Sequence, residues 1–530
     1  MFNDSNQASN HRSHLFVLFI AIYAIGIGAY FALRYAGGWM EIDTARMTNS
    51  ARAVVVEGVI TPSTDVYAHG FAYPVMVAWL AQMTGVSVLQ LQTLYLPLIS
   101  VLLPATAAYA VFRVFLRVES RALLALLILC LQPDFLFVTL RGSHEKITWT
   151  LMLAALFILH QSAARLRAPQ TFIRYILIFY AIVFTQISTN SFFASTFITA
   201  ITFGLLIGLV VKRWTQLDDA DYSVQFLQRM GLVAAASLIL VYIFLVHIYA
   251  PAEQLFQLVP EIVDRVALLV FGFEFQVNPS SYIAFGWLNL PTYLAVSGFT
   301  WLVLAISLGE WCRQALQFVR RERTLQLPHA LPWLLYAGFA IQMVFAVMLD
   351  FAGTLSANLQ LRILPGLLIF AVILTVQAVE ALFRTTTTRP TLQRGLQVAM
   401  IGVFLWAVPA SLLKITNEPL VSNKWVFYDH LEEEGLNWVY THTTPTRNYF
   451  WAGLDERLIV VLAATLDAPE SYFNLDTPGP DVRYYLLSET DRLRHARVER
   501  PLPAIQDENI VYDNGNAKVY HRKPQTPYQE

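Results

Sequence analysis

Long apolar segments, recurring along most of the chain, constrain the fold more than any other feature of this sequence. A membrane-spanning helix needs about 20 apolar residues, and the first such run is HLFVLFIAIYAIGIGAYFALRYAGG near the N-terminus. Only 14% of the 530 residues are charged, against about 25% in soluble proteins. The sequence therefore predicts a polytopic α-helical membrane protein with about 11 transmembrane helices. Their expected bounds are 15–37, 91–112, 121–140, 146–162, 171–188, 192–211, 230–249, 291–311, 331–350, 361–383 and 395–416.

The first apolar run is interpreted as a retained span, because it is too long for a signal-peptide core and lacks a small-residue cleavage site. A shorter run, YPVMVAWLAQMTG, cannot span the bilayer and is predicted to be an interfacial helix. The net charge of −1 gives no electrostatic basis for binding nucleic acid. The two cysteines, Cys130 and Cys312, lie in or beside apolar segments, so the polar C-terminal part does not depend on disulfides.

Basic residues orient the predicted spans through the positive-inside rule. With the N-terminus cytoplasmic, every inner connection is basic, and the outer connections hold fewer basic residues. The inner residues are Arg113, Arg117, Arg121, Arg165, Arg167, Arg174, Lys212, Arg213, Arg229, Arg313, Arg320, Arg321, Arg323, Arg384, Arg389 and Arg394. An odd number of spans then places the C-terminus outside. We expect a multi-pass protein of the plasma (cell) membrane.

Two parts follow from this topology: a transmembrane module over 1–416 and an extracytoplasmic domain over 417–530. The outer face would carry a first loop at 38–90, a turn at 140–146 and a long loop at 250–290. The polar domain alternates strand and helix patterns, and Asp513-Asn514-Gly515 predicts a hairpin, so it is a small α/β domain. In the long loop, LFQLVPEIVDRVALLVFG predicts an amphipathic interfacial helix, which would serve as a lid or access route for a lipid, or simply cover the other loops.

The first outer loop begins with an acidic pair, Glu41-Ile-Asp43. In an extended segment both carboxylates would point to one side, where they could hold a divalent cation or supply a general base. The plain alternative is a solvated loop at a membrane exit. Asp65, His69 and Tyr73 follow in the same loop and are candidates for lining a site.

A second polar cluster, LRGSHEKITW, occupies the short outer turn and contains Arg141, His144, Glu145 and Lys146. Its basic residues could merely snorkel towards water, an interpretation that suits Lys146 better than the acidic Glu145. Two further ionisable residues lie near the outer surface. Asp134, inside the third span, would line a site or pair with a neighbouring helix. Arg362, at the start of the tenth span, would snorkel or bind phosphate in a bidentate manner.

This arrangement of a first span, an acid-x-acid loop, an acidic outer turn and many further spans resembles the GT-C membrane glycosyltransferases. The resemblance covers residues 15–416 and rests on Glu41-Ile-Asp43 and on the turn with Arg141, His144 and Glu145. It implies a polyprenyl-phosphate-linked sugar as donor and a lipid, glycan or protein acceptor. The Trp-Trp-Asp-Tyr-Gly type of motif found in oligosaccharyltransferases is absent, so the donor would carry a single sugar.

The resemblance also implies residue roles. Asp43 would be the base in an inverting transfer to an acceptor hydroxyl. The donor phosphate would be bound by Arg141, Lys146 and Arg362. A Mg²⁺ or Mn²⁺ ion, if one binds, would be held by Glu41, Asp43, His144 and Glu145.

Two other classes of function compete with a glycosyltransferase. A transporter or flippase for lipid-linked saccharides would show inverted repeats and broken helices at the midplane, and the sequence shows no repeat. A noncatalytic receptor or scaffold would bind a partner through its outer domain, and Asp43 would then be dispensable.

Overall fold

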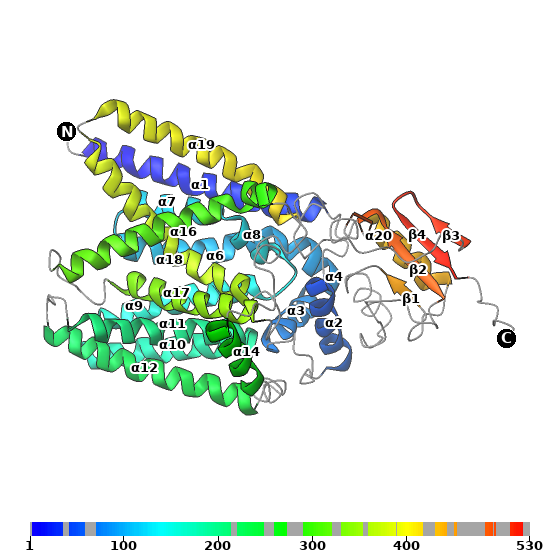
Figure 1. The fold of residues 1–530 in the computed structure, drawn as a ribbon, viewed down its shortest axis with the longest axis horizontal. Coiled ribbons are helices and arrows are strands. Elements are labelled where there is room, and N and C mark those ends of the chain that lie inside the picture. Colours follow the sequence, from blue (N-terminus) through cyan, green and yellow to red (C-terminus); the bar gives the residue numbers. More distant parts are fainter. Residues whose placement is uncertain are drawn as a thin grey trace.

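A computed structural model describes residues 3–34, 42–58, 70–213, 220–247, 259–272, 290–320, 330–352, 359–387, 389–416, 430–442, 450–452, 483–490, 492–493 and 509–522. The described chain is mainly helical, and most helices run side by side in one bundle (Figure 1). In chain order, the first helices are α1 (Asn3–Arg34), α2 (Ile42–Glu57), α3 (Ala72–Thr84), α4 (Val88–Gln90), a π-helical turn η2 (Leu91–Tyr95), α5 (Leu96–Ser100), α6 (Leu102–Leu116), α7 (Glu119–Cys130), α8 (Pro133–Leu140) and α9 (Glu145–Ala163). They continue with α10 (Pro169–Thr189), α11 (Ser191–Val211), α12 (Ala220–His247), α14 (Val259–Gly272), α16 (Leu290–Val319), α17 (Leu331–Phe351), α18 (Leu359–Thr385) and α19 (Pro390–Ile415).

Nine helices among the described residues are long and apolar enough to cross a membrane, or ten if the bent pair α7 and α8 counts as one span. The remaining expected span, 146–162, corresponds to α9. This helix falls short on composition because it begins with Glu145-Lys146 and ends near His160-Gln161. It nevertheless packs against α6 and α10 inside the bundle. The predicted polytopic helical class is confirmed.

The break between α7 and α8 shapes the end of the bundle where the polar turn lies. Gln132 is extended, with φ −74° and ψ 113°, and Pro133 opens α8. Proline disfavours the helical conformation in the residue before it, so α7 ends there, and α8 leaves at an angle of 68°. Helix α8 is only eight residues long, and the short turn at 141–144 connects it to α9.

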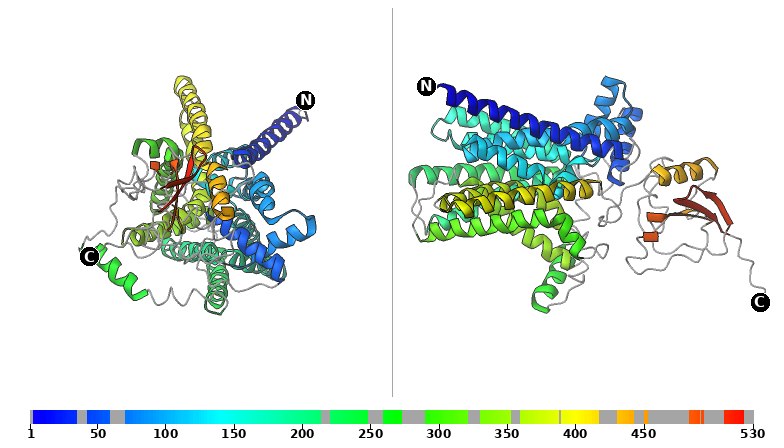
Figure 2. Two further views of the ribbon diagram at one scale, coloured as in Figure 1. Left: turned by 90° about the vertical axis from the view of Figure 1, so that its right-hand side faces the viewer. Right: turned by 90° about the horizontal axis from the view of Figure 1, so that it is seen from above.

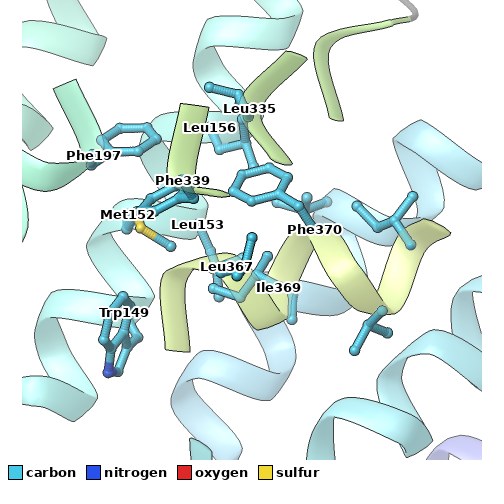
Figure 3. Close-up of a cluster of buried hydrophobic side chains, with 14 of the residues drawn as sticks. Trp149, Met152, Leu153, Leu156, Phe197, Leu335, Phe339, Leu367, Ile369 and Phe370 are labelled. Carbon is cyan, nitrogen blue, oxygen red and sulfur yellow. The ribbon is translucent and has the colours of Figure 1, made fainter. Parts of the chain in front are cut away.

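The core of the bundle is a continuous set of buried apolar side chains, part of which appears in Figure 3. Phe339 of α17 and Phe370 of α18 stack with ring centroids 5.6 Å apart. On its other side α17 meets α11, and a Cβ added at Gly338 would lie 2.9 Å from the carbonyl carbon of Ala200. Small residues of this kind let helices in membranes approach closely. This packing fixes the long helices that frame the polar end of the bundle.

Two short helices, α2 and α3, cover the end of the bundle opposite the N-terminus (Figures 1 and 2). The run predicted as an interfacial helix forms α3, which is 13 residues long and leaves Trp79 and Met83 exposed. One expectation is corrected here: Asp43 does not belong to an extended segment, because it lies in the first turn of α2. Glu41 is outside the described residues.

The amphipathic segment of the long outer loop forms α14, at the same end of the bundle (Figure 1). Its apolar residues Val263, Leu268 and Phe271 are exposed, while Glu261 and Arg265 form an ion pair at 2.5 Å on the helix surface. The predicted amphipathic helix is therefore present, and it contacts α17.

The C-terminal part contains α20 (His430–His442) and a four-stranded sheet in the order β1-β2-β4-β3. Its strands are β1 (Phe450–Ala452), β2 (Tyr484–Ser488), β3 (Asn509–Asp513) and β4 (Ala517–His521). β1 pairs with β2 in parallel, and the other pairs are antiparallel. The predicted hairpin joins β3 to β4, with Gly515 at a φ of 90° that favours glycine. The small α/β domain is thus confirmed, and Figure 1 places it at the bundle end opposite the N-terminus.

Candidate active site

Asp43, Arg141 and Glu145 meet at the end of the bundle that carries α2 and α3. The Nη1 of Arg141 donates to Oδ2 of Asp43 at 2.8 Å, and its Nη2 donates to Oε1 of Glu145 at 2.7 Å. The three residues are 2%, 5% and 6% exposed, respectively. The fold therefore joins the two acidic motifs of the sequence through one buried guanidinium.

The backbone of the turn also holds α2 in place. The amide of Gly142 donates to the Oγ1 of Thr44, the neighbour of Asp43, at 3.2 Å. A Cβ added at Gly142 would lie 2.8 Å from the Cβ of Thr44 and closer still to its hydroxyl and methyl groups. Only glycine fits this approach without a shift, so Gly142 sets the separation of Asp43 from the turn.

Lys146 is fully buried beneath this turn. Its Nζ donates to the carbonyl oxygens of Arg141 at 2.6 Å and Ser143 at 2.7 Å, and lies 5.6 Å from the centre of the Tyr73 ring. The snorkelling interpretation of Lys146 is therefore wrong, because the ammonium points inward and closes the turn. Its role as a phosphate ligand stays a prediction, and two of its three N–H donors are engaged within the turn.

His144 faces α10 and α11 through Asn190, which caps the start of α11. The Oδ1 of Asn190 accepts the amide of Phe193 at 3.0 Å, so its Nδ2 is the group that contacts Nε2 of His144. An amide N–H needs an acceptor, so Nε2 carries a lone pair and the imidazole is neutral. Burial lowers the pKa of His144, against the raising effect of Glu145 and Asp43. Geometry and electrostatics agree on a neutral ring.

Glu145 has both carboxylate oxygens occupied, since the hydroxyl of Ser143 donates to Oε2. Burial by itself raises the pKa of this carboxyl group. The charge of Arg141, together with His144 and the Ser143 hydroxyl, outweighs burial and lowers the pKa to about 2. Glu145 is thus ionised at neutral pH and anchors Arg141.

Tyr73 encloses the same network from α3. It is 1% exposed and its hydroxyl donates to Oε1 of Gln92 at 2.7 Å. Its ring meets the His144 ring edge-on, with centroids 6.2 Å apart. Tyr73 therefore packs against His144 and Lys146 of the polar turn, and its role in lining a substrate site stays a prediction.

Asp134 belongs to a second polar cluster, adjacent to the first. Its Oδ2 accepts from Thr300 of α16 at 2.7 Å, and its Oδ1 lies 3.8 Å from the Nζ of Lys414 on α19. Lys414 and Arg141 both lie near the Phe137 ring, at 5.7 Å and 5.3 Å from its centre. Asp134 is therefore a partner for the neighbouring helices α16 and α19, and its role in lining a site stays a prediction.

Lys414 was missed by the sequence reasoning. The sequence feature that could have identified it is a single lysine inside the last apolar segment, because an ionisable residue in such a segment normally faces the protein interior. Arg362 lies in the first turn of α18, 5.9 Å from the ring of Phe192, which follows Asn190 closely in sequence. Arg362 is thus near the His144 side of the site. Glu41, Asp65 and His69 are outside the described residues.

The side chains that the structure describes do not support a metal site. In the described ranges, no group of three or more His, Cys, Asp or Glu residues could hold an ion. Asp43 and Glu145 both pair with Arg141, and Nε2 of His144 contacts Asn190. The predicted set would depend on Glu41, and metal binding stays a prediction.

Comparisons with known proteins yield structural neighbours only. No family model and no curated protein matches the sequence. ArnT from Cupriavidus metallidurans, solved bound to undecaprenyl phosphate, is similar with a TM-score of 0.50 and 13% identity, over 96% of this chain and 98% of that one. The Archaeoglobus fulgidus oligosaccharyltransferase, solved tethered to an acceptor peptide, is similar with a TM-score of 0.49 and 12% identity, over 97% of this chain and 74% of that one. At such identities the likeness to ArnT shows a shared fold.

Proposed function

Because the chain has the GT-C membrane glycosyltransferase fold, we propose that it is an inverting glycosyltransferase. It moves a sugar from a polyprenyl-phosphate-linked donor to an acceptor hydroxyl at the outer face of the membrane. The observation that carries this proposal is the buried Asp43–Arg141–Glu145 network at one end of a membrane bundle. A lipid-linked donor would present its sugar at that level.

The reaction needs a proton acceptor and a leaving group. Asp43 takes the proton of the acceptor hydroxyl, and the oxygen attacks the anomeric carbon. The bond from that carbon to the phosphate oxygen breaks, and polyprenyl phosphate leaves with the electron pair. Attack opposite the leaving group inverts the anomeric centre. General base catalysis of this kind is worth about 10²–10⁴-fold.

Arg141 positions the base in this scheme. Glu145 fixes one end of the guanidinium, so the other end presents Asp43 in a single orientation. Binding of the donor phosphate by Arg141 is the alternative role. Lys146 and Arg362 are the other proposed phosphate ligands, and Lys414, the ion-pair partner of Asp134, lies beside the same Phe137 ring as Arg141.

The proposed orientation puts the N-terminus in the cytoplasm and the sheet domain outside. Its support is the basic inner connections, together with the position of the sheet domain and the N-terminus at opposite ends of the bundle (Figure 1). The acceptor is a lipid, glycan or protein at that face.

Asp43→Asn tests the function directly. Membranes containing the full chain are incubated with a panel of synthetic undecaprenyl-phosphate monosaccharides and an envelope extract as acceptor, and released undecaprenyl phosphate is measured. We expect release by wild type, and about 10²-fold less or lower with Asp43→Asn. Asp264→Asn on the exposed face of α14 is the matched control. Equal release by Asp43→Asn and wild type would sink the base assignment.

A proposed Mg²⁺ or Mn²⁺ requirement is tested in the same assay. Release is compared after chelation with EDTA and after adding back each ion. Restoration by one ion supports a metal site that includes Glu41. Undiminished release in EDTA excludes it.

A further inference from the structure

A polar cavity of about 360 Å³ lies away from the candidate active site, among α7, α16 and α18. Its lining residues are Arg121, Glu310, Arg313, Gln314, Gln377, Glu380, Ala381 and Arg384. The three arginines come from three separate connections that the sequence assigns to the cytoplasmic face. The positive-inside rule accounts for basic residues on that face, but it does not account for their convergence on one cavity.

The position of the cavity follows from α18, which begins beside the candidate site and ends beside the cavity. Arg362 lies in its first turn and Arg384 in its last. At 1.5 Å per residue, these arginines are about 33 Å apart along the helix, close to the roughly 30 Å of a hydrocarbon core. The cavity therefore lies at the opposite membrane face from Asp43.

One wall of the cavity is a hydrogen-bonded network centred on the buried Glu310. Glu310 is 4% exposed and accepts from Arg313 through both oxygens, at 2.8 and 2.6 Å. Gln314 donates to Glu310 at 2.7 Å and to Gln377 at 2.8 Å. Buried polar groups that are satisfied in this way hold their positions, so this wall is preorganised.

The other wall has spare donor capacity. Arg121 and Arg384 both contact the same oxygen of Glu380, Oε1, each through Nη2. A guanidinium has five N–H donors. Within the described part of the chain, the other donors of these two side chains have no protein partner, and both residues line the cavity.

The charges on the lining select the ligand. Three arginines face two glutamates, which leaves one positive charge. Arginine matches phosphate oxygens with its planar fork, and basic pockets between membrane helices on the cytoplasmic side bind anionic headgroups. We propose that this cavity binds a singly charged phosphate group, from an anionic phospholipid headgroup or from free phosphate, through Arg121 and Arg384.

The test uses the purified full chain in neutral detergent micelles. Binding of phosphatidylglycerol, phosphatidylcholine and inorganic phosphate is measured by native mass spectrometry and by the shift in thermal unfolding. Arg121→Gln/Arg384→Gln is compared with wild type. Arg394→Gln, which removes one positive charge from an exposed arginine early in α19, is the control for the loss of a positive charge outside the cavity.

We expect wild type and Arg394→Gln to bind phosphatidylglycerol, or phosphate, more tightly than phosphatidylcholine. The double variant should bind that anion at least about tenfold more weakly, because each lost charged hydrogen bond supplies a substantial part of the binding free energy. Selectivity for phosphatidylglycerol identifies a headgroup, and equal binding of inorganic phosphate identifies a free anion. The proposal is overturned if neither anion binds, or if the double variant binds as wild type does.

Arg384→Gln alone keeps the test decisive if the double variant cannot be purified as a monodisperse protein. The Arg384 side chain is 71% exposed, and Glu380 keeps its contact with Arg121, so this variant should fold. A reduced anion affinity is expected here too, and unchanged affinity contradicts the proposal.

Discussion

Asp43 and Arg141 are 98 residues apart in sequence, and they form a buried ion pair at 2.8 Å. The pair ties the first acidic motif to the polar turn after α8. Glu145 holds the second guanidinium nitrogen at 2.7 Å, so the arginine is fixed from both sides. This geometry makes the orientation of Asp43 depend on a residue that need not touch substrate.

Arg141→Lys should separate positioning from phosphate binding. A single ammonium cannot replace a fork that spans two carboxylates, so Asp43 would lose its orientation. We expect kcat for sugar transfer to fall about 100-fold, with little change in KM for the lipid donor. A raised donor KM at unchanged kcat would contradict positioning and support Arg141 as a phosphate ligand.

Arg141→Ala should also destabilise the protein. It leaves two buried carboxylates without their shared cation, a type of change that costs about 3–5 kcal/mol. The midpoint of thermal unfolding in detergent, compared with that of Arg394→Ala, measures the effect. A matched midpoint for the two variants would show that the network contributes nothing to stability.

The sequence predicted the bundle better than the site, for physical reasons. Span length and polarity are local properties, so helices such as α10 and α17 were recognisable from their residues alone. The role of Lys146 was not, because its partners are backbone carbonyls of a turn that only tertiary packing brings inward. Lys414 was overlooked because one charge hardly changes the apolar character of a long segment. Asp43 was expected in an extended segment but lies in the first turn of α2, and the contact of Thr44 with Gly142 that positions this helix joins residues 98 positions apart.

Gly142→Ala should disrupt the approach of the turn to α2. The new Cβ would overlap the side chain of Thr44, and overpacking of this kind costs about 1–3 kcal/mol. We expect a lower unfolding midpoint and reduced transfer. Adding Thr44→Ala, which removes the hydroxyl and methyl groups in the overlap, should restore part of both. If the double variant behaves no better than the single one, steric overlap at Thr44 is not the cause.

Asp134 and Lys414 should show coupled stabilities. Lys414→Met leaves the Asp134 carboxylate with Thr300 as a neutral donor, and Asp134→Asn leaves the ammonium without its anion. In a double-mutant cycle, residues in one such network couple by about 0.5–3 kcal/mol. The double variant should therefore be more stable than the sum of the single effects predicts. Strictly additive effects would mean that the 3.8 Å pair contributes no energy.

His144 should make stability fall on mild acidification. Its folded pKa lies below the ordinary 6.5, so the unfolded chain binds a proton first, and stability is lost as the pH falls below 6.5. Glu145 affects stability over a different pH range. Its pKa is lowered from 4.5 to about 2, so its contribution to the stability of the folded state is complete above pH 4.5 and is lost only below that pH. Between pH 6.5 and 4.5 the change in stability therefore reports His144 and not Glu145.

We expect His144→Gln, which keeps a polar side chain opposite Asn190, to reduce the dependence of the unfolding midpoint on pH over that interval. His442→Gln, at an exposed position on α20, should leave the slope unchanged. A wild-type slope in His144→Gln would mean that the neutral imidazole is not what acid disrupts.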